Sequence, residues 1–490
     1  MQLAELINTL TPRKVTGNLN QEITGLAQDS RRVQAGNLFF CIKGVKYDGH
    51  QFLKEVATRG GTAAIVSDPP AETYGLTIIQ VDKVSSQLVK EVAGAFYGYP
   101  DRKLQLIGVT GTNGKTTSTY LVKSILESAG HKVGLIGTIT NLIKDRPLAT
   151  HNTTPGVLEL QELFAEMVRS GVEYVVMEVS SHSIDQGRVT GLDFRCGIFT
   201  NITQDHLDYH KTFAEYLRVK SKFFLDLPTT SWAIINGDDP HSESIIEKTA
   251  AKVVTYGVEH SAQISATNIQ LSPTGVSYTA NTPVGPLELR LHLTGYFNVY
   301  NSLGALGAGL VLGMDPAAIK QGLEAVPGVP GRFQVVPGVT DFGVIVDYAH
   351  TPDGLENILN TGRALTKKRL LLVFGCGGDR DRTKRPIMGA LAANLADYSI
   401  ITSDNPRSEQ PEAIIAEIEA GFKAANPGAA YQLEPDRAAA IRKIIKLAQP
   451  GDLVIIAGKG HENYQIFKDR TIHFDDREVA QAALEELQHG

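Results

Sequence analysis

The stretch that decides the fold is Gly108-Val109-Thr110-Gly111-Thr112-Asn113-Gly114-Lys115-Thr116-Thr117. It follows an apolar strand expected at 104–109 and precedes a helical segment, which is where a phosphate-binding loop stands in α/β proteins. Its glycines let backbone N–H groups face phosphate oxygens, Lys115 adds positive charge, and the Thr116 hydroxyl suits Mg²⁺. The strict GxxxxGK[ST] pattern needs glycine at 109, where the chain has valine. We expect 111–117 to bind ATP; a glycine-rich turn without ligand is the alternative.

Strands and helices alternate on both sides of this loop. From 104 to about 257, strands such as 174–177 and 233–235 alternate with helical stretches such as 158–168, which predicts a mainly parallel sheet covered by helices. Residues 261–293 change to short period-two segments, which predicts an appended antiparallel patch. Residues 1–100 hold short alternating segments, such as 37–42 and 63–66, that indicate a small α/β domain.

Two breaks divide the chain. Tyr99-Pro100-Asp101-Arg102 precedes the loop-bearing strand, and Pro327-Gly328-Val329-Pro330-Gly331-Arg332 cannot continue a helix or a central strand. Beyond the second break, near-continuous apolar runs indicate strands buried on both faces, at 344–346, 370–374, 398–402 and 453–457. The sequence therefore predicts an α/β fold with three domains, at 1–100, 101–331 and 332–490.

Composition excludes several classes of function. With 490 residues the chain is too long for one core. A net charge of -6 gives no basic field for nucleic acid. The three cysteines include no CxxC pair, so neither a disulfide framework nor a zinc knuckle is expected. No apolar run reaches the length of a membrane span, and the first residues do not resemble a signal peptide. We expect a cytoplasmic monomer without membrane insertion.

Two further segments carry candidate chemistry. Glu178 ends an apolar strand beside the phosphate loop, which suits a magnesium ligand, although a buried glutamate with a structural partner is the alternative. Residues 200–210 place two histidines and two aspartates in one loop, which is consistent with metal binding, with acid–base work or with a hydrogen-bonded surface feature. By default, Lys220 and Lys222 on the following helix are solvated cations.

Eight motifs in fixed order resemble the Mur ligases along nearly the whole chain: TGTNGKTT, MEVSSH, TNITQDHLDYH, YFNVYN, GRF, DYAHTPD, SDNPR and AGKGHE. The resemblance implies a small N-terminal domain that binds a UDP-sugar peptide and a central P-loop ATPase with a mainly parallel sheet. It also implies a C-terminal Rossmann-like domain that closes over the site and binds an amino acid.

The resemblance implies roles position by position. The residues that would bind the ATP phosphates are Gly111, Thr112, Asn113, Gly114, Lys115, Thr116 and Thr117. The residues that would contact the rest of ATP are Asn298, Asn301, Arg332, Asp347 and His350. The Mg²⁺ ligands would be Thr116, Glu178, His206 and Lys220. The catalytic residues would be Lys115, Glu178, His206 and Lys220. Lys220 matches the family's carbamylated lysine (N6-carboxylysine). Addition of CO₂ to its neutral amine would turn a cation into an anion able to help hold a metal.

Other motifs resemble the branch that extends UDP-MurNAc-L-Ala-D-Glu. The UDP-MurNAc-peptide contacts would be Gln28, Ser30, Val45, Lys46, Tyr47, Asn152, Thr153, Thr154, Ser180, Gln186 and Arg188. Val45 to Tyr47 depart from the family's usual residues. The contacts to meso-diaminopimelate would be Arg380, Asp404, Asn405, Pro406, Arg407, Gly458 and Glu462. A guanidinium at 407 can hold a distal carboxylate with two hydrogen bonds, whereas it would repel the ammonium of lysine.

The resemblance therefore implies ATP-dependent addition of meso-diaminopimelate to UDP-MurNAc-L-Ala-D-Glu through an acyl phosphate, with Mg²⁺. Three alternatives stay open: a lysine-adding ligase, a folylpolyglutamate-type ligase, and a P-loop regulatory protein that binds nucleotide without making bonds. Arg407 argues against the first, and the N-terminal domain argues against the second. The third would be expected to lose Glu178, His206 or Lys220, and the chain keeps all three.

Overall fold

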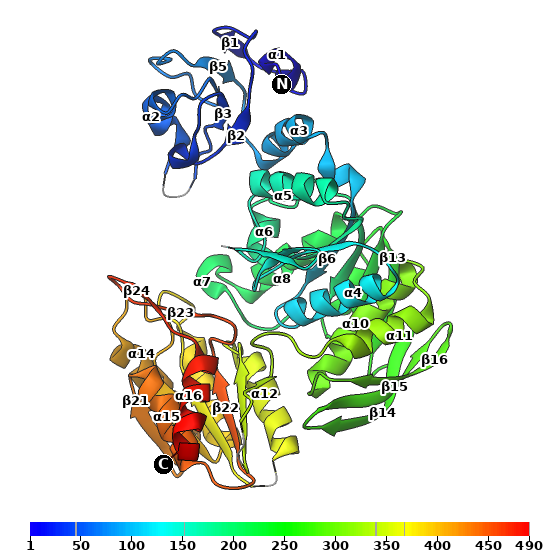
Figure 1. Cartoon of the computed structure of the whole chain (residues 1–490), viewed down its shortest axis with the longest axis vertical. Helices are drawn as coiled ribbons and strands as arrows, with labels where there is room; N and C mark the ends of the chain where they lie inside the picture. Colours follow the sequence, from blue (N-terminus) through cyan, green and yellow to red (C-terminus); the bar gives the residue numbers. More distant parts are fainter. Residues whose placement is uncertain (45–46, 151, 339–340, 367, 490) are drawn as a thin grey trace. The chain divides into compact units, whose positions relative to one another are not determined.

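A computed structural model describes residues 1–44, 47–150, 152–338, 341–366 and 368–489 (Figure 1). The chain forms two compact units, Met1–Ile107 with His131–Arg195, and Gly108–Gly130 with Cys196–Gly490. Within the described ranges, no helix combines the length and apolar character that a bilayer span needs. The domain boundaries at 100/101 and 331/332 stay predictions.

The first unit begins with a five-stranded sheet in the order β1-β5-β4-β3-β2, parallel except for β1. The strands are β1 Lys14–Thr16, β2 Gly25–Ala27, β3 Asn37–Phe40, β4 Ala63–Val66 and β5 Thr77–Gln80. The helices are α1 Leu3–Ile7, α2 Leu53–Thr58 and α3 Ser86–Tyr97, with 3₁₀ turns at Ser30–Arg32, Gly49–Phe52 and Pro100–Lys103.

The predicted alternation in this sheet is wrong at its centre. Every residue of β3 and β4 is buried. Phe40 and Ile65 pack with α1 and α3 on one face, while Phe39 and Val66 pack with α2 on the other. Helices on both faces remove the solvent side that an alternating pattern requires.

The chain passes between the two units within two strands of one large mixed sheet. These strands are β6 Gln105–Thr110 and β11 Phe194–Phe199. The first unit contributes the order β6-β10-β7-β8-β9. Its elements are β7 Val133–Ile136, β8 Asn141–Ile143, β9 Arg146–Leu148, α5 Val157–Arg169, β10 Tyr174–Glu178 and α6 Ser181–Asp185. The α5 helix packs against α3 within this unit.

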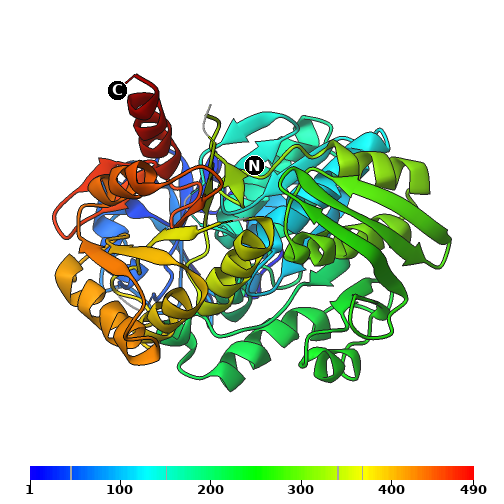
Figure 2. The same cartoon turned by 90° about the horizontal axis from the view of Figure 1, so that it is seen from below.

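The second unit contributes the order β16-β15-β14-β13-β12-β11-β6. Its elements here are α4 Lys115–Ser128, α7 Leu207–His210, α8 Phe213–Leu225, β12 Trp232–Asn236, α9 Ser242–Ile246, β13 Lys252–Gly257, β14 Ile264–Ser272, β15 Gly275–Thr282, β16 Gly285–Leu291, α10 Tyr296–Val311 and α11 Pro316–Ala325. The strands β14, β15 and β16 pair antiparallel with one another, as predicted for 261–293, and are the long green strands at the right of Figure 2. Residues 207–210, predicted as loop, form a short helix.

The C-terminal part of the second unit has a six-stranded sheet in the order β17-β18-β22-β19-β20-β21 (Figure 1). Its elements are β17 Gln334–Val335, β18 Gly343–Asp347, α12 Pro352–Leu365, β19 Leu370–Phe374, α13 Lys384–Leu395, β20 Tyr398–Thr402, α14 Pro411–Ala425, β21 Tyr431–Glu434, α15 Arg437–Leu447, β22 Leu453–Ala457 and α16 Asp476–His489, with the hairpin β23 Tyr464–Ile466 and β24 Thr471–His473. Leu372 packs with α12, α13 and α14 on one face, and Leu371 packs with α15 and α16 on the other. The predicted doubly buried strands are confirmed.

Candidate active site

The phosphate loop follows β6, and α4 begins at Lys115, as predicted. Gly114, with φ +85°, adopts a left-handed conformation that favours glycine. The Lys115 ammonium donates to the carbonyls of Gly111 and Thr112, at 2.9 and 2.8 Å. The lysine therefore curls over its own loop, at the N-terminus of a helix, where a phosphate would be attracted.

Residues after β11 brace this loop. The backbone N–H of Asn113 donates to the Asn201 side chain at 2.9 Å, and the Thr200 hydroxyl donates to the Asn113 carbonyl at 2.6 Å. A Cβ on Gly111 would lie 1.8 Å from the Thr200 hydroxyl oxygen, so only glycine fits. Sequence reasoning assigned no role to Asn201, whose only signal was its place in the TNITQDHLDYH motif.

The predicted nucleotide contacts on α10 lie beside the loop. Asn298 and Asn301 are buried, and Asn301 donates to Asn298 at 2.9 Å. A Cβ on Gly114 would lie 2.3 Å from the Asn301 side-chain oxygen. Asn301 therefore lies against the phosphate loop, and Asn298 is bonded to it, both on the helix that follows the antiparallel strands.

Arg332 links the linker region to the loop. One of its nitrogens donates to the Thr116 hydroxyl at 3.0 Å, and its guanidinium lies 4.5 Å from the centre of the Tyr348 ring. Asp347 accepts from the backbone of Phe333 and Ala349 at 2.6 and 2.7 Å, and burial raises its pKa. Burial, helped by the charge of Lys384, lowers the pKa of His350 to about 4. These three predicted ATP contacts follow one another along the start of the C-terminal part.

Lys220 is not the solvated cation expected by default. Its side chain is 2% exposed, and its ammonium donates to the Gly111 carbonyl at 2.7 Å. Burial, with the positive charge of Lys115, lowers its pKa far below the usual value. Lys222, two residues later, is half-exposed and pairs with Asp226, as a solvated lysine would. The fold thus brings Lys220 and Lys115 onto the same loop.

His206 lies in the segment that follows the bracing residues. It has φ +54°, and its Nε2 lies 3.3 Å from the Asp205 carboxylate. Burial alone would raise the pKa of Asp205, but the charges of His206 and Lys384 outweigh it and lower that pKa. Asp205 therefore stays a carboxylate that orients the imidazole.

In the first unit, Glu178 is held at the end of β10. It is 1% exposed and accepts from the backbone N–H and the hydroxyl of Thr138, at 2.9 and 3.0 Å. The Thr138 hydroxyl also lies 3.0 Å from that of Thr153. A Cβ on Gly137 would lie 2.6 Å from a Glu178 oxygen. Thr138, which no sequence motif indicated, thus joins Glu178 to a predicted peptide contact.

The other predicted peptide contacts of the first unit form one network. The Thr154 hydroxyl lies 3.3 Å from that of Ser180, the N-cap of α6, and Arg188 donates to the Thr154 carbonyl at 2.7 Å. Arg188 also donates twice to the Gln186 side chain. Asn152 is exposed beside them.

The predicted uridine contacts are partly described. Gln28 directs its amide nitrogen to within 3.2 Å of where a Cβ on Gly156 would stand, close to the peptide contacts. Ser30 is buried and donates to Glu55 at 2.9 Å, whereas Tyr47 is 70% exposed. Val45 and Lys46 lie outside the described residues.

Two arginines lie together in the predicted amino-acid site. Arg407, with φ +53°, donates to the carbonyls of Gly378 and Asn405. Burial, together with the charge of Arg380, lowers its pKa. Arg380 donates to the carbonyl of Asp379. In the described part of the chain, neither guanidinium forms an ion pair with a carboxylate, which leaves a positive site suited to an anion.

The rest of this predicted site lies at the ends of β20 and β22. Asn405 donates to Glu462 at 2.8 Å, and Pro406 packs so closely that a Cβ on Gly378 would lie 1.9 Å from its carbonyl oxygen. A Cβ on Gly458, which has φ +120°, would lie 2.7 Å from Asp404. These strands are parallel neighbours of β19, so their carboxyl ends share one edge.

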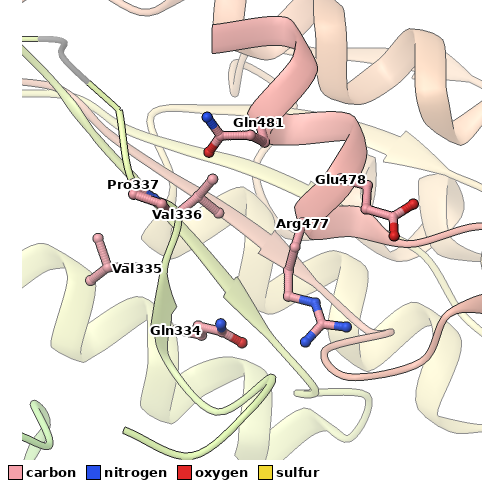
Figure 3. Close-up of a pocket in the computed structure, with 7 residues that line it drawn as sticks. All are labelled: Gln334, Val335, Val336, Pro337, Arg477, Glu478 and Gln481. Atoms are coloured by element: carbon pink, nitrogen blue, oxygen red, sulfur yellow. The ribbon is translucent and has the colours of Figure 1, made fainter. Parts of the chain in front are cut away.

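A separate pocket of about 260 Å³ lies between β17 and α16 (Figure 3). It is lined by Gln334, Val335, Val336, Pro337, Arg477, Glu478 and Gln481, and none of these is a predicted site residue. Arg477 pairs with Asp475, and Glu478 pairs with His473. The charged lining residues thus have partners of their own.

Comparison with known proteins explains the arrangement. The chain matches the profiles of the Mur ligase family catalytic domain at 22–99, the Mur ligase middle domain at 109–309 and the Mur ligase glutamate ligase domain at 331–460. These matches agree with the expected three-domain α/β fold.

Individual proteins match over the full length. A UDP-N-acetylmuramoyl-L-alanyl-D-glutamate–2,6-diaminopimelate ligase of Clostridium acetobutylicum is 45% identical, covering 99% of this chain and 100% of that one. A ligase of the same name from Geobacillus thermodenitrificans is 46% identical, with coverages of 99% and 100%. A solved structure of such a ligase superposes with a TM-score of 0.68 at 31% identity and covers 100% of both chains. The chain therefore belongs to the Mur ligase family.

Proposed function

We propose that the protein joins meso-2,6-diaminopimelate to UDP-MurNAc-L-Ala-D-Glu at the expense of ATP, in the synthesis of peptidoglycan precursors. Full-length relatives at about 45% identity carry the name of this activity. The observation that carries the choice of amino acid is the pair Arg380 and Arg407, whose guanidiniums lack carboxylate partners in the described ranges. A substrate carboxylate would supply the missing partner.

The proposed reaction has two steps. The side-chain carboxylate of D-Glu attacks the γ-phosphorus of ATP, so a carboxyl–phosphate bond forms and ADP leaves. The amine of diaminopimelate then attacks the acyl carbon, loses a proton, and displaces phosphate to form the amide. The chain needs no protein nucleophile for this chemistry, so positioning and charge stabilisation carry the catalysis.

The phosphate loop supplies that stabilisation. Lys115, now bonded to loop carbonyls, would turn to the phosphoryl oxygens once ATP is present. Arg332, which donates to Thr116, is the second cation directed at the loop. Asn298, Asn301, Asp347 and His350 would bind the rest of the nucleotide. Because His350 has a pKa of about 4, it stays neutral at physiological pH and can act as an acceptor as well as a donor.

Magnesium fits the donors that this chain offers. Thr116, Glu178 and His206 supply a hydroxyl, a carboxylate and an imidazole, and a carbamylated Lys220 would add a further oxygen ligand. The buried Lys220 amine is suited to that modification, because burial and the charge of Lys115 lower its pKa and so favour the neutral, nucleophilic form. Bound Mg²⁺ would offset the charge of the phosphates. Lys220, held against the loop, would orient the group formed on it.

The remaining contacts fall to the first unit. The network of Thr153, Thr154, Ser180, Gln186 and Arg188 would bind the sugar and peptide, with Asn152 beside it. Gln28, Ser30, Val45, Lys46 and Tyr47 would bind the uridine end. The short approach of Gln28 to Gly156 supports neighbouring uridine and peptide subsites.

The test is amino-acid-dependent phosphate release with ATP, Mg²⁺ and UDP-MurNAc-L-Ala-D-Glu, with product mass measured. Diaminopimelate and L-lysine are offered in parallel to the wild type and to Arg407→Met. We expect turnover with diaminopimelate, and a loss of about 10- to 100-fold in kcat/KM on removal of a charge-assisted pair. Preference of the wild type for lysine would contradict the amino-acid assignment, and no turnover with either would favour a non-catalytic nucleotide-binding protein.

A further inference from the structure

Lys459 is a buried charge to which no role has been assigned so far. It follows Gly458 directly after β22 and is 0% exposed. Its ammonium donates to a Glu462 oxygen at 2.9 Å and to the Asn405 side-chain oxygen at 3.2 Å, and it lies 5.4 Å from the centre of the Tyr464 ring. A lysine removed from water this completely must find its partners inside the protein.

Its two partners are also bonded to each other. The Asn405 amide nitrogen donates to the same Glu462 oxygen at 2.8 Å, and the Asn405 oxygen also accepts from the backbone of Ile466 at 3.0 Å. Lysine is only a donor, so its contact fixes which end of the Asn405 amide faces which neighbour. Lys459, Asn405 and Glu462 therefore form a closed triangle, in which each side chain is hydrogen-bonded to the other two.

Two carboxylates lie close together beside this triangle. Asp404 is buried next to Asn405, and the positive charge of Arg407 acts on both Asp404 and Glu462. Burial and Asp404 raise the pKa of Glu462, and Lys459 opposes them. The neighbouring carboxylates of Asp404 and Glu462 would attract an incoming ammonium.

We propose that Lys459 is a positioning residue for the amino-acid substrate, because it fixes Asn405 and Glu462 in the arrangement that receives the ammonium at the far end of that substrate. The inference rests on the proposed function and on the prediction that Glu462 contacts diaminopimelate, and it assigns to the Glu462 carboxylate the distal ammonium of that substrate. It adds a residue that need not touch the substrate. The effect should therefore depend on the presence of the distal amine.

The experiment compares two amino acids that differ only in that amine, meso-diaminopimelate and 2-aminopimelate. Steady-state kinetics are measured for the wild type, Lys459→Met, Glu462→Gln and the double variant. Lys423→Met is the control, since Lys423 is an exposed lysine paired with Glu419 in the same domain. We expect Lys459→Met to raise the KM for diaminopimelate about 10-fold or more while kcat and the kinetics with 2-aminopimelate change less than about 3-fold.

The double variant separates positioning from misfolding. If Lys459 acts through Glu462, adding Lys459→Met to Glu462→Gln should change the KM for diaminopimelate less than about 2-fold, because the partner no longer carries charge. Equal losses with both amino acids, or fully additive effects, would overturn the inference, and so would an unchanged KM in Lys459→Met. A wild type that does not use diaminopimelate would instead refute the proposed function itself.

Discussion

At the scale of the residue, the site is built from charges that the fold has taken out of water. Lys115 and Lys220 both donate to the Gly111 carbonyl, so two lysine side chains meet at one neutral acceptor. A carbonyl dipole stabilises an ammonium less than an anion does. This is the arrangement expected where an anionic ligand supplies the rest of the stabilisation.

Lys220 should be carbamylated at neutral pH. In ¹³C-bicarbonate we expect a carbamate carbon signal in the wild type that is absent from Lys220→Gln, with activity reduced by about 100-fold or more through the lost charge. Lys222→Gln is the matched control on the same helix, because Lys222 is half-exposed and paired with Asp226. A carbamate signal that survives in Lys220→Gln and disappears in Lys222→Gln would contradict the assignment.

His461 should make the protein less stable in acid. Burial, with the charge of Arg332, lowers its pKa to about 3, so the folded state excludes a proton that the unfolded state binds below about 6.5. Stability is therefore lost as the pH falls from 6.5 towards 3, by up to about 1.4 kcal/mol per pH unit. In thermal scans, His461→Gln should lose less of its Tm than the wild type over this range.

His473 provides a control of opposite sign. It is exposed, and its hydrogen bond with Glu478 raises its pKa. The contribution of His473 to stability is present below its pKa in the unfolded chain, and it is lost as the pH rises through its pKa in the folded protein. His473→Gln should therefore cost stability mainly in acid. Parallel pH profiles for the two variants would refute both assignments.

At the scale of the element, close helix packing supports the amino-acid site. A Cβ on Gly421 of α14 would lie 2.0 Å from the Pro386 carbonyl oxygen of α13, and one on Gly389 of α13 would lie 2.1 Å from the Ile418 carbonyl oxygen. Arg385, fully buried on α13, pairs with Glu409 and Glu417. The segments that carry Arg380 and Arg407 are thus attached to two helices in direct backbone contact.

Replacement of Gly421 by alanine should destabilise the protein, although a glycine-to-alanine change in a helix usually stabilises it. In an open helix this change stabilises by about 1 kcal/mol, but here the added methyl meets backbone that cannot move away cheaply. We expect the Tm to fall by several degrees, since overpacking costs about 1–3 kcal/mol. Ala416 is exposed on the same helix, so Ala416→Gly should cost only the difference in helix propensity between alanine and glycine. A Tm that rises in Gly421→Ala would show that α13 and α14 are not so close.

At the scale of the whole molecule, the proposed site draws on residues from 28 to 462, so no single segment can do the chemistry. The C-terminal part nevertheless has its own sheet and a hydrophobic cluster on each face.

The fragment 328–490 should therefore fold alone but not ligate. We expect a cooperative thermal transition by circular dichroism and no phosphate release with the full set of substrates. The same fragment with Leu372→Asp, which places a charge inside one cluster, is the unfolded control. A wild-type fragment without a transition would place the domain boundary elsewhere.

The sequence by itself determined the strands that are buried on both faces, because such a strand has to be a near-continuous apolar run. Residues 370–374, 398–402 and 453–457 were predicted to the residue, because runs buried on both faces are apolar throughout. The phosphate loop was equally readable, since glycines and a lysine must stand at fixed spacing. The ordered motifs then indicated the family and the reaction.

Only the tertiary structure decided which charges are buried and what they meet. Lys220 and Lys222 are alike in sequence, yet one is enclosed against Gly111 and the other is solvated. Thr138 and Lys459 gained their partners Glu178 and Asn405 from strand ends brought together by the sheets. Burial and charge pairing depend on residues far apart in the chain, so local pattern cannot specify them.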